Sequence, residues 1–140
     1  MRVSRVTGAV LSGVLATVTF GAIPAHAEGS KTSYISYRAT GAEPGRWTDN
    51  NNDGASTTVR LSNCKTASSP DTRTSAAVSV WKDVFGPDTN KGSKSDVCSA
   101  TKSWGGDLAS GDYYFSLDKI NGTSGPGTFH LYAKPVKMTW

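Results

Sequence analysis

Five segments of this chain alternate apolar and polar residues, and this alternation constrains the fold more than any other feature of the sequence. The segments cover residues 33–39, 57–63, 76–83, 112–118 and 129–140. Side chains two positions apart share a face of a β-strand, so each segment predicts a strand with one buried face. The residues expected to point inward are Ile35, Tyr37, Ala39, Val59, Leu61, Val78, Val80, Tyr113, Phe115, Leu117, Phe129, Leu131, Ala133, Val136, Met138 and Trp140. The last segment changes parity across Lys134-Pro135, which predicts a bulge or an edge position there.

The segments between these strands are rich in Gly, Pro, Asn, Asp and Ser, the residues typical of turns. They cover residues 41–54, 63–74, 85–96 and 121–127, and residues 101–109 fit an irregular strand or a loop. No convincing helical stripe follows residue 27. We therefore expect an all-β chain, a single antiparallel β-sandwich of roughly six to eight short strands.

The N-terminus has the ordered parts of a secretory signal. Arg2 and Arg5 precede a modestly apolar stretch over residues 6–20, and Ala25-His26-Ala27 offers a cleavage site. The stretch is too short and too mixed to span a bilayer stably. We expect residues 1–27 to be a cleaved signal peptide and residues 28–140 to form one secreted, extracellular domain without stable membrane insertion.

Export changes the meaning of the charge and of the cysteines. Loss of Arg2 and Arg5 from the 15 basic residues leaves 13 against 11 acidic ones, and no run of Lys and Arg follows. Without a clustered basic stripe, nucleic acid is not an expected partner. Cys64 and Cys98 are the two cysteines, and in an exported chain they predict a disulfide bond.

A segment near the C-terminus resembles part of a known family. The stretch Asp107-Leu108-Ala109-Ser110-Gly111-Asp112-Tyr113-Tyr114-Phe115-Ser116-Leu117, a Gly/Asn turn and Thr128-Phe129-His130-Leu131 follow one another. They are similar to the closing hairpin of bacterial pre-peptidase C-terminal domains, which are small β-sandwiches. The resemblance implies an accessory or adhesive module of the kind attached to exported enzymes.

Catalytic groups are scarce after residue 27, which favours a protein that is not an enzyme. His130 is the one histidine left and is expected at an exposed strand position, while Glu28 lies at the frayed new terminus and Glu43 lies in a loop.

The segment Asp49-Asn50-Asn51-Asn52-Asp53-Gly54 resembles the first half of an acidic calcium loop, with Asp49, Asn51 and Asp53 as ligands. Arg60 stands where the bidentate glutamate should be, so a solvated turn is the competing interpretation and no cofactor is required.

Four aromatic residues fall on the outward parity of the predicted strands: Tyr34, Trp81, Tyr114 and Tyr132. Exposed rings on a rigid sheet can stack on sugars or anchor a protein partner, and the competing interpretation is that they form cross-strand pairs that stabilise the sheet. The loop residue Trp47 is a further candidate for ligand contact.

Two classes of function fit these features. The first is a secreted non-catalytic binding or adhesion module that recognises an extracellular polysaccharide or protein through an aromatic sheet face, with Trp81 and Tyr114 as main contacts and Tyr34 and Tyr132 beside them. The second is a secreted inhibitor or toxin-like effector directed at an extracellular enzyme or a competing cell. It would use an exposed loop within residues 63–74 or 85–96, and a protruding ordered loop would favour it.

Overall fold

The computed structural model describes residues 27–68, 74–106 and 108–140, and the described chain contains strands and no helix. The predicted signal peptide therefore lies, up to residue 26, outside the described residues. The described residues form nine strands: β1 Ser30–Arg38, β2 Gly45–Asp49, β3 Ser56–Leu61, β4 Lys65–Thr66, β5 Ala76–Asp83, β6 Thr89–Lys94, β7 Lys102–Gly106, β8 Gly111–Ile120 and β9 Leu131–Thr139. The all-β prediction is confirmed, with more strands than the six to eight expected.

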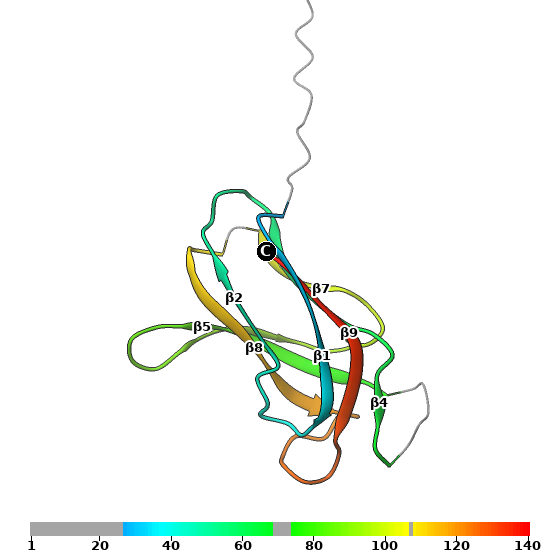
Figure 1. Cartoon of the computed structure of the whole chain (residues 1–140). Helices are drawn as coiled ribbons and strands as arrows, with labels where there is room; N and C mark the ends of the chain where they lie inside the picture. Colours follow the sequence, from blue (N-terminus) through cyan, green and yellow to red (C-terminus); the bar gives the residue numbers. More distant parts are fainter. Residues whose placement is uncertain (1–26, 69–73, 107) are drawn as a thin grey trace, which may run out of the picture.

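The strands form two antiparallel sheets (Figure 1). The first, called sheet A here, has the order β1-β9-β3-β7, with the short β4 also paired to β9. The second, sheet B, has the order β2-β8-β5-β6. Apolar side chains from both sheets make one core, so the arrangement is that of a β-sandwich.

Most of the residues that the alternation predicted to point inward lie in the core. Val59 and Leu61 of sheet A and Val80, Phe115 and Leu117 of sheet B have no exposed surface. Sheet A adds Leu131, Val136 and Met138, all at most 1% exposed. Burying side chains of this size stabilises the fold by roughly 1.5–3 kcal/mol each.

Two local irregularities set which residues of sheet A face outward. Ser33 lies opposite Val136 while Ile35 lies opposite Ala133, so β9 carries one extra residue at Lys134-Pro135, and the predicted bulge is confirmed. The edge alternative for Pro135 is wrong, because β9 lies between β1 and β3.

The second irregularity is at Tyr37, whose inward assignment is wrong. Its φ of 52° breaks the alternation, and the register slips again between Ile35 and Arg38. The ring consequently points to solvent and is 55% exposed.

The final two strands do not form the expected hairpin. β8 pairs with β2 and β5 in sheet B, whereas β9 pairs with β1, β3 and β4 in sheet A. The segment from residue 121 to residue 130 therefore crosses from one sheet to the other (Figure 1).

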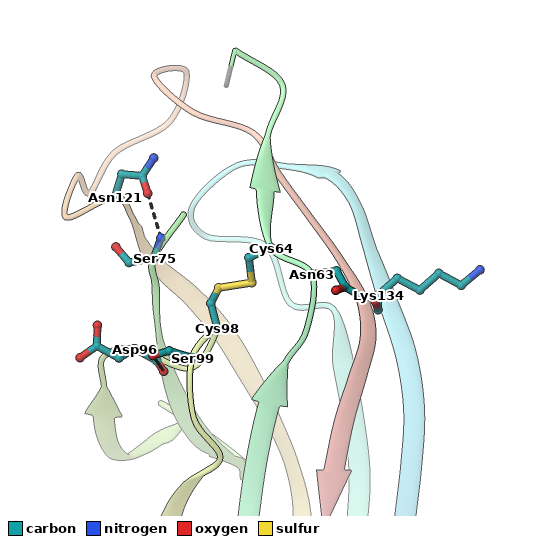
Figure 2. The surroundings of a disulfide bond; sticks show 8 residues. All are labelled: Asn63, Cys64, Ser75, Asp96, Cys98, Ser99, Asn121 and Lys134. Carbon is teal, nitrogen blue, oxygen red and sulfur yellow. Dashed lines mark hydrogen bonds between the residues drawn. A yellow bond between two sulfur atoms is a disulfide. The ribbon is translucent and has the colours of Figure 1, made fainter. Parts of the chain in front are cut away.

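The predicted disulfide bond is present between Cys64 and Cys98, with a Cα–Cα distance of 5.8 Å. Cys64 lies between β3 and β4, and Cys98 lies in the turn that connects β6 to β7 (Figure 2). The bond thus ties the β3–β4 connection of sheet A to the connection between the two sheets. Cys64 is buried, and its sequence neighbours Asn63 and Lys65 are exposed.

Candidate functional site

The four predicted contact aromatics divide between the two sheets. Trp81 and Tyr114 belong to β5 and β8 of sheet B, and Tyr34 and Tyr132 belong to β1 and β9 of sheet A. Each ring lies on the outer face of its own sheet, as expected. The outer faces of the two sheets of a sandwich point in opposite directions, however. A single platform of four rings is therefore wrong, and each pair forms a surface of its own.

The Trp81–Tyr114 pair is built into sheet B. The two residues are direct cross-strand partners, and their rings stack with 6.5 Å between centroids and 9° between planes. Arg46 covers Tyr114 with its guanidinium carbon 4.7 Å from the ring centroid, and Tyr114 is only 7% exposed. A ring with one face stacked and the other under a guanidinium has little surface left for a ligand.

The polar atoms of this pair also have partners. Trp81 Nε1 donates to Ser116 Oγ at 3.0 Å, and the Tyr114 hydroxyl donates to Asp88 Oδ2 at 2.7 Å. That bond to a carboxylate stabilises the phenol over the phenolate and raises the pKa of Tyr114 to about 12. The same bond, with the Val84 N–H donated to Oδ1, lowers the pKa of Asp88. The pair fits the cross-strand interpretation.

A polar cavity of about 300 Å³ lies beside this pair, lined by Arg46, Trp47, Thr48, Asp83, Asp112 and Tyr113. Arg46 forms ion pairs with Asp83 at 2.9 Å and with Glu43 at 2.6 Å. Thr48 Oγ1 donates to Asp112 at 2.6 Å. The charged side chains of this cavity thus already have polar partners within the protein.

The Tyr34–Tyr132 pair has a different environment on sheet A. Tyr34 is 63% exposed, and both rings line an open cavity of about 300 Å³. The other lining residues are Ile35, Ser36, Asn63, Lys65, Ala133 and Lys134. The cavity combines apolar ring surface with amide, hydroxyl and ammonium groups, which is the usual composition of a small-molecule or sugar site.

Three polar side chains of this cavity come from the bulge and from the chain next to the disulfide. Asn63 Nδ2 donates to the Lys134 carbonyl oxygen at 2.8 Å and so joins the β3–β4 connection to β9 (Figure 2). Lys65 lies opposite Tyr132 in the β4–β9 register, with its ammonium 5.9 Å from the ring centroid. Neither the Lys65 nor the Lys134 ammonium lies within ion-pair distance of a carboxylate in the described chain.

Tyr37, which the alternation placed in the core, extends this aromatic surface. Its ring stacks on His130 with 4.1 Å between centroids and 7° between planes, and it lies 6.0 Å from the Tyr132 ring. His130 precedes β9 and is half-buried. We use the name tyrosine face for Tyr34, Tyr37 and Tyr132 together with the cavity beside Tyr34. The sequence signal missed Tyr37 because a positive φ at a tyrosine leaves no trace in the alternation.

Trp47, expected in a loop and as a further ligand contact, lies in a strand and in the core, so its assignment to a loop is wrong. It lies in β2, is 6% exposed and stacks against Tyr113 and Trp140, each with a centroid distance of 6.0 Å. Among the described residues, its buried indole N–H has no hydrogen-bond partner. The surrounding Gly and Asn residues are typical of turns, and for that reason the five-residue strand β2 was assigned to a loop.

The calcium candidate is a turn closed by its own carboxylates. Asp49 Oδ1 accepts the Asn51 N–H and Asp53 Oδ1 accepts the Ala55 N–H, both at 2.8 Å. Glu28 is half-buried rather than frayed, and its two oxygens accept the N–H groups of Asn50 and Asn52, each at 2.9 Å. Those bonds lower the pKa of Glu28, with the bond from Asn52 contributing most.

The turn at residues 49–54 thus directs backbone N–H groups at a carboxylate rather than oxygens at a cation. Within the described residues, no group of three His, Cys, Asp or Glu side chains is placed to hold a metal ion. The geometry favours the interpretation as a turn between strands.

The β5–β6 hairpin extends from the body of the protein (Figure 1). Phe85 in its turn is fully exposed, and Asp88 closes the turn by accepting the Val84 N–H at 3.2 Å. The Tyr114 hydroxyl holds the same Asp88 to sheet B. Half of the predicted loop over residues 85–96 is therefore strand β6, and residues 85–88 and 95–96 are not in a strand.

The class of protein that these features define is an all-β protein of two antiparallel sheets, closed by one disulfide, with an open tyrosine-lined cavity on one sheet. No protein-family model matches the chain, and searches of curated proteins and of solved structures find no similar protein. In the part of the chain that the structure describes, no helix is long and apolar enough to cross a membrane.

Proposed function

We propose that this protein is a secreted, non-catalytic binding module that recognises an extracellular polysaccharide through the tyrosine face of sheet A. The observation that carries the proposal is the cavity of about 300 Å³ beside Tyr34 and Tyr132. Aromatic rings on a rigid sheet bind sugars by stacking on the apolar face of the pyranose, while nearby polar groups select the orientation of its hydroxyls. This assignment moves the expected contacts from Trp81 and Tyr114 to the flanking pair.

The contrast between the two ring pairs supports this choice. Tyr34 is 63% exposed, whereas Tyr114 is 7% exposed under Arg46. Within the described ranges, the ammonium groups of the cavity on sheet A form no ion pair, whereas Arg46 beside Tyr114 is paired with Asp83 and Glu43. A ligand at sheet B would have to break these interactions first, and a ligand at the tyrosine face would not.

The test is binding of the mature protein to a panel of immobilised polysaccharides, with Tyr34→Ala as the variant and Phe85→Ala as the matched control. Both substitutions remove an exposed aromatic ring, so both variants should fold. We expect Tyr34→Ala to weaken binding by about tenfold, which corresponds to roughly 1.4 kcal/mol, and Phe85→Ala to leave it unchanged. Equal binding by wild type and Tyr34→Ala would refute the proposal.

A protein inhibitor is the second candidate, and Phe85 is the observation that favours it. A fully exposed phenylalanine on a closed turn can enter an apolar pocket of a protein partner at a small entropic cost. In that case Phe85→Ala abolishes inhibition of an extracellular hydrolase and Tyr34→Ala does not. The same two variants thus distinguish the two functions.

A further inference from the structure

The fold sorts charges that are mixed along the sequence. The strands of sheet A contain seven Lys and Arg residues and no Asp or Glu: Lys31, Arg38, Arg60, Lys65, Lys102, Lys134 and Lys137. The strands of sheet B contain five basic residues and four acidic ones. The two ion pairs recorded among the described residues both belong to Arg46 of sheet B. Sheet A therefore has a positive surface that its own strands do not neutralise.

One pair of like charges is placed directly face to face. Arg60 of β3 and Lys137 of β9 are register partners, and both are exposed between buried neighbours, so both project from the outer face of sheet A. Like charges at directly opposite positions destabilise a sheet. Thr32, on the other side of Lys137, is uncharged and offers no compensation. The repulsion is relieved when an anion binds between the two cations.

These cations continue the tyrosine face. Tyr132, Lys134 and Lys137 all face outward on β9, because the extra residue at the bulge brings Lys137 rather than Val136 to the outer face. A strand rises about 3.3 Å per residue, so this row extends over roughly 16 Å. A surface of that length, with rings at one end and paired cations at the other, suits a chain rather than a compact ligand.

We infer that the polysaccharide bound at the tyrosine face is anionic, with its carboxylate, sulfate or phosphate groups lying between Arg60, Lys137 and the cavity lysines Lys65 and Lys134. This inference rests on the proposed function and specifies its ligand. A neutral sugar would use the rings but would leave the Arg60–Lys137 repulsion in place. The net charge of the residues after the predicted signal is small, so the attraction is local to sheet A and is screened beyond about 10 Å at 0.1 M salt.

The test compares anionic polysaccharides with neutral counterparts of the same backbone. Polygalacturonate and its fully methyl-esterified form are one pair, and a sulfated and a phosphate-bearing polysaccharide, each with its uncharged form, complete the panel. We expect at least one anionic form to bind about tenfold more tightly than its neutral counterpart at 50 mM NaCl and to lose most of this preference at 200 mM, because bound salt ions are released on binding.

Charge-removing variants locate the effect. Arg60→Gln with Lys137→Gln should abolish the preference for the anionic form and leave binding of the neutral form unchanged. The matched control is Lys91→Gln with Lys94→Gln on β6, which removes two charges from sheet B. It should retain the preference.

Three outcomes would overturn the inference. Equal binding of charged and neutral forms that still depends on Tyr34 would refute the anionic ligand and keep the proposed function. Equal effects of the two double variants would assign the preference to net charge rather than to Arg60 and Lys137. Tighter binding of single- or double-stranded DNA than of any polysaccharide would identify a different class of polyanion.

Discussion

Removal of the Cys64–Cys98 bond is the perturbation whose magnitude follows most directly from the structure. The bond closes a loop of 35 residues, counted from a sequence separation of 34. In the chain-entropy model, a loop of this length restricts the unfolded chain by about 4 kcal/mol at 25 °C. A single domain has a free energy of unfolding of about 5–15 kcal/mol, so the loss is a large share of the total. We expect Cys64→Ala with Cys98→Ala to lower the melting temperature by roughly 15 °C.

The assay is equilibrium unfolding in guanidinium chloride, which reports both the free energy and its dependence on denaturant. Without the cross-link the unfolded chain exposes more surface. The dependence of the free energy of unfolding on denaturant concentration (the m-value) should therefore rise, while the free energy of unfolding itself falls. Reduction of the wild-type protein is the control for the two lost sulfur atoms, since it breaks the bond and keeps them. The double variant and the reduced protein should agree within about 1 kcal/mol. A loss below about 1 kcal/mol in both would refute the argument.

The same perturbation affects the proposed binding surface. Cys64 is buried between Asn63 and Lys65, and both of these residues line the cavity beside Tyr34. With the bond removed, the β3–β4 connection depends on local contacts such as the Asn63–Lys134 hydrogen bond. We expect weaker polysaccharide binding by the double variant at temperatures where it is still folded. Unchanged affinity would show that the pairing of β4 with β9 is enough to hold Asn63 and Lys65 in place without the disulfide.

Three further predictions concern the core, a tyrosine and the N-terminal carboxylate. Phe115→Ala removes a fully buried ring and should lower the free energy of unfolding by about 3–5 kcal/mol, whereas Phe85→Ala should change it by at most about 0.5 kcal/mol; similar losses would contradict the assigned core. Burial also raises the pKa of Tyr113, so the test is the response to a variant: ultraviolet titration should show a tyrosine with a pKa of about 12, which Asp88→Asn should return toward 10. Because this pKa is raised on folding, the bond stabilises the folded state below pH 10, and this stabilisation is lost as the pH rises towards 12. The absence of a tyrosine that titrates at high pH would refute the Tyr114–Asp88 bond. The pKa of Glu28 is lowered, so its stabilisation is present above the ordinary value of 4.5 and is lost as the pH falls through the lowered one. The Glu28→Gln variant should therefore have a lower melting temperature than the wild type at pH 7 and the same melting temperature at pH 2. A difference of equal size at both pH values would refute this.

The alternation predicted five of the nine described strands and missed β2, β4, β6 and β7. All five predicted strands are present, and each contributes at least one apolar side chain to the core. β6 has the sequence TNKGSK, without one apolar residue, and it lies at the edge of sheet B. A strand of this kind is held by backbone pairing with β5, and backbone pairing leaves no pattern in the sequence.

The candidate site was predicted in part, for a similar reason. Parity correctly placed Tyr34 and Tyr132 on an outer face, since it depends only on the residues around each position. It failed at Tyr37, where a single backbone angle of 52° reverses the direction of the ring. Tyrosine rarely adopts a positive φ, so the conformation is imposed by the pairing of β1 with β9 rather than by the residue itself.

Local pattern tells on which side of a strand a residue lies, but not to which sheet the strand belongs. Here β1 and β9, the first and last strands, are neighbours, while β2, which follows β1 along the chain, joins the opposite sheet. The charges are mixed along the sequence because strands of the two sheets follow one another along the chain. Arg60 and Lys137 come from distant segments and lie face to face in sheet A. The same distribution of strands between the sheets divides the four outward rings into two pairs. One pair is stacked on sheet B, and the other lies beside the open cavity of sheet A. Arg60 and Lys137 become neighbours only when β3 and β9 belong to the same sheet, so an anionic ligand can be inferred from the structure and not from the sequence.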